Sequence, residues 1–292
     1  NKAVYAYAVV VPMKRFQTSP CQSILVDGTL MTFDTPIIMG ILNVTPDSFY
    51  DGGDNTTVER AVGKAKELLL EGAQILDIGA YSSRPGAPLI SSQEEMDRAL
   101  PPIRAIKAAF PDAILSIDTF RADVAAAAVE AGVHIINDVS GGTLDDNMFA
   151  TVAKYQVPYI LMHMRGIPEN MQEKTDYTDI VTDVATFLGE RIAVLRSMGV
   201  KDIILDPGFG FAKTAEQNYE LLYRVNELHY FELPILGGIS RKSMIYKKIG
   251  ITAQEALNGT TALNTLLLER GVQILRVHDV KEAKQLVDLF YS

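Results

Sequence analysis

The stretch AILSIDTFRADVAAAAVEAGVHIINDVSGG, at residues 113–142, contains a strand, a helix and a second strand in succession. Its two apolar runs, Ile114–Ile117 and Ile135–Asn137, are short, rich in β-branched residues and free of alternation, which is typical of strands buried on both faces. The segment 122–132 between them has helical composition and spacing. The stretch therefore predicts one strand–helix–strand unit of a parallel sheet.

The same alternation recurs along most of the chain, without a convincing linker between units. Six more apolar runs are interpreted as buried strands: Ile37–Leu42, Ile75–Ile78, Tyr159–Met162, Ile203–Leu205, Ile235–Gly238 and Ile274–Val277. Eight such units within roughly 250 residues are typical of an α/β fold with a single (β/α)8 TIM barrel. A doubly wound open sheet is the alternative that the pattern leaves open.

The segment before the first unit predicts an N-terminal β-hairpin. In ILVDGTLMTF (24–33), the pair Asp27-Gly28 separates two apolar runs, which is a strong hairpin signal. We expect residues 23–292 to form one barrel domain and residues 1–22 to be a poorly ordered extension rather than a signal peptide.

Three local signals mark the first two helices after the hairpin. Gly72 is expected to end the helix that starts near residue 58. Ser91 and Ser92, followed by Glu94 and Glu95, form a capping-box pattern at the start of the next helix. The prolines at positions 101–102 are expected to bend or split that helix.

The bulk composition excludes several classes of protein. The chain has 292 residues, 48% of them hydrophobic, and a net charge of −9, so nucleic-acid binding is not expected as its main activity. Its single cysteine, Cys21, excludes an internal disulfide framework and suits a reducing cytoplasm. Because no stretch approaches 18 consecutive apolar residues, no membrane span or membrane partner is expected.

Polar residues stand at all eight predicted strand ends, which in a TIM barrel meet at one face where active sites are built. Capping and loop hydrogen bonds explain any single one of them. As a set they predict acceptors on one side and cations on the other, which suits a heterocycle that donates hydrogen bonds and carries an anionic tail. The strand ends carry Asn43, Asp77, the acceptors Asp118, Asn137 and Asp206, Met162 with His163, and the cations Lys242, Arg276 and His278, joined by Arg84 from a loop.

Anion binding is expected after the seventh and eighth strands, where TIM barrels often hold phosphate. The sequences SRKS (240–243) and RVHD (276–279) lie at these two places. A zinc site built from His163, Asp206, Asp51 and Asn43 is disfavoured, because the four histidines show no i,i+4 spacing. Mg²⁺ held by a phosphate and one or two side-chain oxygens is the more natural metal. On this view His163 is a satisfied interior histidine.

Several separated motifs in order give the chain a close resemblance to the dihydropteroate synthase family of pterin-binding barrels. The resemblance covers about positions 35–290. The motifs are GILNVTPDSFYDGG, DIGAYSSRPGA, SIDTF, INDVSGG, LMHMRGIPENMQ, LDPGFGFAKT, GISRKS and RVHDVKE. The resemblance implies a transferase of folate biosynthesis that joins (7,8-dihydropterin-6-yl)methyl diphosphate to 4-aminobenzoate and releases diphosphate by a dissociative mechanism. It also implies Mg²⁺ as a cofactor and a homodimer.

The resemblance also implies roles for individual residues, matched motif by motif. Asp118, Asp206 and Lys242 would be catalytic. The pterin would be held by these three and Asn137, and its slot would be lined by Met162 and Gly238. The diphosphate would be bound by Arg84, Arg276 and His278, with Asn43 as the Mg²⁺ ligand. The 4-aminobenzoate site would be formed by Phe49, Ser83, Pro85, Phe211, Lys242 and Ser243, with the helix start after Ser243 receiving the carboxylate.

Two segments depart from the family pattern, and a third is interpreted as mobile. The second loop, Gly79–Gly86, lacks the acid that the family usually has, and Ser83 replaces threonine. Ala212 stands where glycine is frequent, which would add strain if that position has positive φ. The first loop, around residues 44–55, is interpreted as a lid in which Phe49 covers the aminobenzoate and Asp51 contacts the second loop.

Three other functions share parts of this pattern. A pterin-binding methyltransferase domain would use the same barrel and acids, but it has no need of the long first loop, SRKS and RVHD. A Schiff-base aldolase could use Lys242, although Arg241 and Arg276 nearby favour anion binding. A non-catalytic pterin-binding paralogue is the third alternative.

Overall fold

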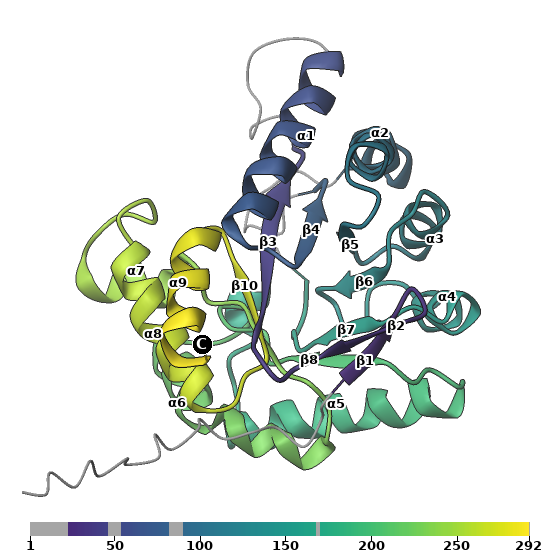
Figure 1. The fold of residues 1–292 in the computed structure, drawn as a ribbon. Helices are drawn as coiled ribbons and strands as arrows, with labels where there is room; N and C mark the ends of the chain where they lie inside the picture. The colour runs from purple at the N-terminus through teal and green to yellow at the C-terminus, as the bar shows by residue number, and fades with distance from the viewer. Residues whose placement is uncertain (1–22, 46–53, 82–89, 168–169, 292) are drawn as a thin grey trace, which may run out of the picture.

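A computed structural model describes residues 23–45, 54–81, 90–167 and 170–291. Eight parallel strands form the centre of the molecule, and the helices surround them (Figure 1). The strand order is β8-β7-β6-β5-β4-β3-β10-β9. The strands are β3 (Ile37–Asn43), β4 (Ile75–Gly79), β5 (Ile114–Asp118), β6 (Ile135–Asp138), β7 (Tyr159–Met162), β8 (Ile203–Asp206), β9 (Leu236–Gly237) and β10 (Ile274–Val277).

The two ends of this strand order meet, so the sheet closes on itself. Strand β10 pairs with both β3 and β9, and a parallel bridge joins Leu205 of β8 to Ile235, just before β9. The Leu205 N–H also donates to the Pro234 carbonyl oxygen at 2.8 Å. The TIM barrel is therefore confirmed against the open-sheet alternative, and the join between β8 and β9 is its most thinly bonded part.

The strand bounds differ from the predicted ones mainly at the carboxyl ends. Strands β3, β5, β6 and β8 continue into the polar residue that follows the apolar run, and β4 continues into Gly79, because the backbone there still pairs with the neighbouring strand. Strand β9 is shorter than predicted and contains only Leu236 and Gly237. The polar side chains therefore stand on the rigid barrel wall itself rather than on the loops that follow it.

Nine helices cover the barrel in the part of the chain that the structure describes. No helix there is both long enough and apolar enough to cross a membrane. The helices are α1 (Asp54–Glu71), α2 (Ser92–Ala109), α3 (Ala122–Glu130), α4 (Met148–Tyr155), α5 (Ile180–Ser197), α6 (Ala215–Arg224), α7 (Ser243–Ile249), α8 (Leu257–Glu269) and α9 (Val280–Tyr291), with 3-10 turns at Met171–Glu173 and Val225–Phe231.

Helix α2 tests two of the local signals, and helix α1 tests the third. Its start is capped as predicted, since the Ser91 side chain accepts a bond from the Glu94 N–H at 3.1 Å. The predicted break at Pro101 and Pro102 is wrong, because α2 runs without interruption through both prolines. Pro102 and Ile103 are buried, so packing holds the helix across the hydrogen bonds that proline cannot make. Helix α1 ends at Glu71, before Gly72 with φ 108°, as expected.

The predicted hairpin is present and closes one end of the barrel. Strands β1 (Ser23–Val26) and β2 (Thr29–Thr32) pair in antiparallel fashion around Asp27 and Gly28, whose φ angles of 47° and 75° suit a tight hairpin turn. The Leu25 N–H donates to Asp202 Oδ1 at 3.0 Å, which ties the hairpin to the approach of β8.

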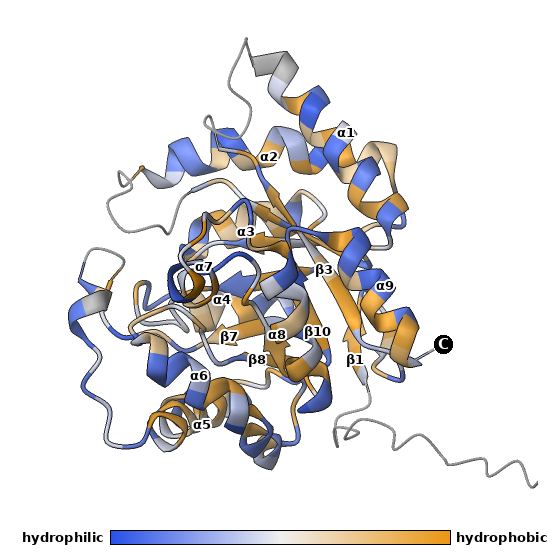
Figure 2. Ribbon diagram, turned by 90° about the vertical axis from the view of Figure 1, so that its left-hand side faces the viewer, coloured by the Kyte–Doolittle hydropathy of each residue, from blue (hydrophilic) through white to orange (hydrophobic). Residues whose placement is uncertain are grey.

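The apolar core has two parts, one outside and one inside the barrel wall. The larger part lies between strands and helices, and Figure 2 shows strands in the colours of hydrophobic residues beneath helices of mixed character. The smaller part, which we call the floor, fills the amino-terminal end of the barrel beneath the hairpin residues Ile24 and Val26. The floor residues are Ile37, Met39, Ile75, Ile135, Ile160, Ile204, Leu236 and Ile274.

Candidate active site

The strand register places several predicted site residues at one level of the barrel wall. Asn43 is paired with Gly79, Gly79 with Asp118, and Asp118 with Asn137 across four neighbouring strands. We call the carboxyl end of the barrel, where these residues lie, the mouth. A Cβ at Gly79 would lie 3.2 Å from Asn43 Oδ1 and 3.9 Å from Asp118 Oδ2, so glycine leaves space between these two side chains.

A buried carboxylate, Asp77, connects two of the predicted site residues. Asp77 Oδ2 accepts hydrogen bonds from Asn137 Nδ2 at 3.0 Å and from Arg276 Nε at 2.6 Å. The side chain is fully buried, and its second oxygen, Oδ1, has no partner among the residues that the structure describes. Asp77 therefore fixes the orientation of an amide and a guanidinium that face the same space.

The second hydrogen bond of Arg276 goes to Asp118, with Nη2 2.8 Å from Oδ2. The predicted separation of acceptors and cations does not hold here, because Arg276 lies between two carboxylates. Burial raises the pKa of Asp118 to about 7, and the charge of Arg276 opposes that rise. Arg276 thus places one positive charge between two buried carboxylates, and each of them accepts a hydrogen bond from it.

Asp206 and Lys242 form the other charged part of the mouth. Asp206 Oδ1 accepts from the Gly208 N–H at 2.7 Å, and burial raises its pKa while Lys242 opposes the rise. Burial lowers the pKa of Lys242 to about 8, and the charge of Asp206 acts against it. A Cβ at Gly238 would lie 3.9 Å from both Asp206 Oδ2 and the Arg276 Cβ, so this glycine keeps the slot between them open.

An apolar cluster forms one wall of the mouth. It contains Met162 and Ala212, both buried, with the partly buried Phe211 and Tyr81 packed against them. The Lys242 ammonium lies 4.7 Å from the centre of the Phe211 ring, a cation–π contact. Ala212 has a φ of 50°, so the positive φ that would strain an alanine is present.

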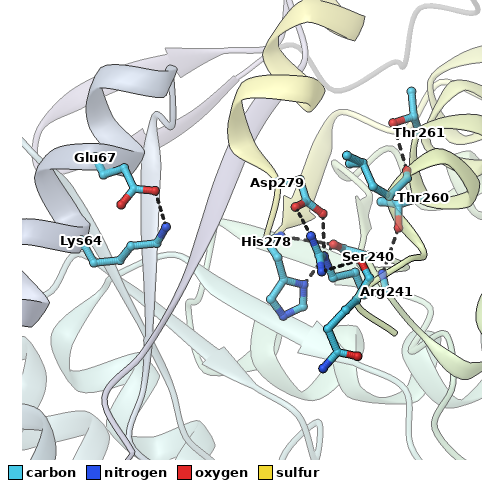
Figure 3. Close-up of polar contacts among 10 residues, drawn as sticks. Lys64, Glu67, Ser240, Arg241, Thr260, Thr261, His278 and Asp279 are labelled. Carbon is cyan, nitrogen blue, oxygen red and sulfur yellow. Dashed lines mark hydrogen bonds and ion pairs between the residues drawn. The ribbon is translucent and has the colours of Figure 1, made fainter. Parts of the chain in front are cut away.

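The eighth strand end places His278 beside Ser240, as Figure 3 shows. His278 Nδ1 lies 3.0 Å from Ser240 Oγ, and the His278 backbone N–H donates to the same oxygen at 3.2 Å. Arg241, whose position suggested anion binding, is paired with a carboxylate. Its guanidinium makes two hydrogen bonds to the Asp279 carboxylate, with Nε 2.9 Å from Oδ2, and this pair links the strand ends of β9 and β10.

Comparison with known proteins agrees with this geometry. Residues 39–278 match the sequence profile of the pterin binding enzyme family. A dihydropteroate synthase of Streptococcus pyogenes serotype M3 is 44% identical over 254 residues, which cover 86% of this chain and 92% of that protein. The chain belongs to the dihydropteroate synthase family. The predicted family, and with it the transferase class, is thereby confirmed.

Solved structures of the dihydropteroate synthase family have the same fold. The Xanthomonas albilineans enzyme with 4-aminobenzoic acid has a TM-score of 0.85 and 39% identity, covering 94% of this chain and 97% of that one. The same enzyme in complex with 7,8-dihydropteroate has a TM-score of 0.80 and 38% identity, covering 90% and 95%. These structures bind both halves of the product in a barrel similar to this one.

Two residues of the dihydropteroate synthase mouth were missed as site residues. Asp77 stood at a predicted strand end but received no role, although its two-residue spacing from Ile75 places it on the inner face. Lys213 lies within the motif LDPGFGFAKT and is 4% exposed, which is rare for a lysine. His163, by contrast, is the interior histidine that was expected, with 1% exposure.

The predicted metal ligand Asn43 offers a single neutral oxygen at the end of β3. No group of three His, Cys, Asp or Glu side chains that could hold a metal occurs within the described ranges. That donor set suits a hard cation such as Mg²⁺ that takes most of its ligands from water and phosphate oxygens. It does not suit zinc, in agreement with the spacing of the histidines.

Some residues expected in a dihydropteroate synthase site fall outside the described part of the chain. They are Phe49, Asp51, Ser83, Arg84 and Pro85, together with most of the proposed lid. Ser243 is described, and it is the first residue of α7, preceded by Lys242 at the N-cap position.

Proposed function

We propose that this chain joins (7,8-dihydropterin-6-yl)methyl diphosphate to 4-aminobenzoate, giving 7,8-dihydropteroate and diphosphate. The observation that carries this proposal is the buried polar network of the mouth. Asp118, Asn137 and Asp206 provide acceptors there, Lys242 and Arg276 provide cations, and Met162 contributes an apolar wall. A ligand with hydrogen-bond donors, an anionic group and an apolar ring face would match these three kinds of surface.

The proposed pterin site lies between Asp118, Asn137 and Asp206. A pterin carries ring N–H and amino groups, and two carboxylates and an amide oxygen are suitable acceptors in a buried site. Met162 and Gly238 would line the faces of the ring. Lys242, whose pKa burial lowers to about 8, would donate to the carbonyl and ring nitrogen acceptors of the pterin.

The diphosphate would bind at the end of β10. Arg276 keeps donors beyond the two that contact Asp77 and Asp118, since a guanidinium has five N–H bonds. His278 is exposed beside Ser240, and Arg84 from the second loop would complete the cationic set. Asn43 would be the protein ligand of Mg²⁺, which when bound supplies charge stabilisation to the departing diphosphate.

The proposed reaction is dissociative. The bond between the pterin methylene carbon and the diphosphate oxygen breaks, and its electron pair leaves with the diphosphate. The positive charge that remains on the delocalised pterin would be stabilised by the carboxylates Asp118 and Asp206. The amine of 4-aminobenzoate then donates its lone pair to that carbon and loses a proton to solvent. No enzyme nucleophile takes part.

The 4-aminobenzoate would lie against Phe211 and Lys242, with Ser243 donating to its carboxylate. Phe49, Ser83 and Pro85 would complete this site. The cation–π contact between Lys242 and Phe211 supports this arrangement, because it holds a positive charge and an apolar ring side by side.

Two wider features are also proposals. We propose a cytoplasmic location, because the single cysteine suits a reducing compartment. We propose a homodimer formed through outer helices, where Tyr223 and Ile249 are 51% and 60% exposed. Sedimentation equilibrium should then give twice the 32.0 kDa of one chain, and a monomer mass at assay concentrations would contradict it.

The purified protein with Mg²⁺ should form dihydropteroate when both substrates are present. Detection of the product by chromatography and of diphosphate by a coupled assay tests the proposal directly. Absence of product under these conditions would refute the catalytic proposal. Trapping of a carbonyl substrate on Lys242 by borohydride would favour an aldolase instead.

Replacement of Arg276 tests its proposed contact with the diphosphate separately from binding of the pterin ring. Arg276→Ala should weaken binding of the pterin diphosphate by about 30-fold or more, since a buried charged pair is lost. Binding of the same pterin without phosphates should change much less. Isothermal titration with the two ligands measures both effects, and equal losses would contradict the diphosphate role.

A further inference from the structure

Lys213 is a buried lysine that none of the roles above uses. Its Nζ lies 2.9 Å from His163 Nδ1, 2.8 Å from the Gly208 carbonyl oxygen and 3.0 Å from the Phe211 carbonyl oxygen. These three acceptors match the three N–H bonds of an ammonium group. Removal of the amine would therefore take a donor from three buried acceptors at once.

His163 gives this lysine a fixed attachment to the barrel wall. The His163 backbone N–H donates to the Asp206 carbonyl oxygen at 2.9 Å, and its ring packs edge-on against Phe187 with centres 4.9 Å apart. Burial, together with the charge of Lys213, lowers the pKa of His163 to about 2. The imidazole is therefore neutral, and its Nδ1 accepts the bond from Lys213.

The loop 207–212, which Lys213 follows, has a strained and compact backbone. Gly208 and Gly210 have φ angles of 70° and 83°, and Ala212 has a φ of 50°. A Cβ at Gly208 would lie 2.0 Å from the His163 carbonyl oxygen, so the loop passes directly against the end of β7. The two carbonyl oxygens bound by Lys213 belong to Gly208 and Phe211, which lie at the two ends of the turn.

Residues 209–211 of this loop contact the Lys242 side chain. The Phe209 carbonyl oxygen accepts a hydrogen bond from Lys242 Nζ. A Cβ at Gly210 would lie 3.2 Å from Lys242 Cδ, so the lysine stem packs closely against this glycine. The Phe211 ring lies under the Lys242 ammonium at 4.7 Å. The position of Lys242 thus depends on the conformation of three consecutive loop residues.

We propose that Lys213 is a positioning residue that holds the loop 207–212 in the shape required by Lys242 and Phe211, and so sets the 4-aminobenzoate side of the active site. This inference rests on the proposed function. No hydrogen bond joins Lys213 to Asp118, Asn137 or Arg276 in the described structure. The loop does contact Asp206, through the Gly208 N–H, and Lys242, and both are proposed to hold the pterin. The effect should therefore reach both substrates and be larger for 4-aminobenzoate, because Phe211 and Lys242 both lie on that side. Displacements of about 1 Å in a positioned group can reduce rates by about 100-fold.

Steady-state kinetics of Lys213→Met test the proposal, since methionine keeps most of the side-chain length and removes every donor. We expect KM for 4-aminobenzoate to rise about tenfold or more. KM for the pterin diphosphate should rise by a smaller factor, because Asp118, Asn137 and Arg276 make no hydrogen bond with Lys213 in the described part of the chain. The milder variant His163→Leu removes one acceptor only, and it should give a smaller split in the same direction if Lys213→Met fails to fold.

Gln273→Met provides the matched control for a purely structural loss. Gln273 is 4% exposed, and its Oε1 accepts from the Ile235 N–H at 2.9 Å, away from the loop. This variant should lose stability while the ratio of the two KM values stays at the wild-type value. An unchanged ratio in folded Lys213→Met and His163→Leu would overturn the proposal. Failure of the wild-type enzyme to form product would instead overturn the proposed function.

Discussion

The two ends of this barrel are built from the same strands and have opposite chemistry. The floor contains apolar side chains, and Ile24 and Val26 of the hairpin cover it at the amino-terminal end of the barrel. The mouth contains five buried or half-buried charged groups, which are Asp77, Asp118, Asp206, Lys242 and Arg276. At the floor the side chains fill the barrel, whereas at the mouth they hold one another by hydrogen bonds. Stability and chemistry are thus separated along the barrel axis.

Strand β8 shows how short the distance between these two functions is. Ile204 belongs to the floor and Asp206 to the mouth, and both point inward because side chains on a strand alternate between faces. Ile203, before Ile204, and Leu205, between Ile204 and Asp206, face the helices. Two residues on one face of one strand should therefore respond to mutation in opposite ways.

The largest effect is expected at Asp206. Asp206→Asn removes the charge of a proposed pterin acceptor, and kcat/KM should fall by about 100-fold or more. The free energy of unfolding should change little, because burial already disfavours the charged form of this group. Activity assays and urea unfolding measure the two quantities. A large loss of stability with full activity would break the comparison.

At Ile204 the opposite result is expected. Ile204→Ala leaves a cavity in the floor and should lower the free energy of unfolding by about 2–5 kcal/mol. Protein that remains folded at low temperature should keep its kcat/KM, because Asp206 is held by its own backbone pairing and by Gly208. A fall in kcat/KM similar to that of Asp206→Asn would mean that the two ends are coupled.

The pH dependence of stability offers a finer test at Asp118. Burial raises its pKa from 3.8 to about 7, so between these values the folded protein binds more protons than the unfolded chain. The free energy of unfolding contributed by this group therefore falls as pH rises from about 4 to about 7. Asp118→Asn removes that term. Its stability relative to wild type should rise over this range in urea titrations, and a constant difference would contradict the prediction.

The smallest effect is expected in the hairpin. Gly28 has a φ of 75°, and a Cβ there would meet nothing within 4 Å, so only backbone strain opposes a side chain. Gly28→Ala should lower the free energy of unfolding by about 1 kcal/mol and leave activity unchanged. Thermal unfolding and the product assay measure both, and a clear loss of activity would show that the hairpin affects the mouth.

The fold and the position of the mouth could be predicted because parallel strands impose simple rules. Buried strands have unalternating apolar runs, and their carboxyl ends must meet at one face. Asn43, Asp118 and Asn137 were therefore placed together correctly, as the register confirms. The hairpin followed from Asp27-Gly28 because few residues adopt the φ angles of such a turn.

The pairing of charges could not be predicted in the same way. Arg276 can reach several acceptors, and only the three-dimensional arrangement places Asp77 and Asp118 beside it. Arg241 looked equivalent in sequence, yet Asp279 lies close enough to bind it. The partner of a long charged side chain depends on the three-dimensional arrangement, whereas the sequence shows only which charged residues are present.

Helix α2 and Lys213 illustrate two further limits. Intrinsic preference predicted a break at the prolines, but the burial of Pro102 and Ile103 outweighed it. Lys213 received no role from its motif, and its three acceptors could be identified only from the fold. Tertiary packing decided both cases.

The thin join between β8 and β9 has a consequence for how the ring of strands behaves over time. Within the described residues, the Leu205–Ile235 bridge and the bond from the Leu205 N–H to Pro234 are the only backbone links between the two strands. Asp206 follows one side of this join and Lys242 the other. A ligand that contacts both Asp206 and Lys242 would connect the two sides of this join and stabilise it. Amide hydrogens near Ile235 should then exchange with solvent more slowly in the liganded enzyme, although no ligand atom touches them.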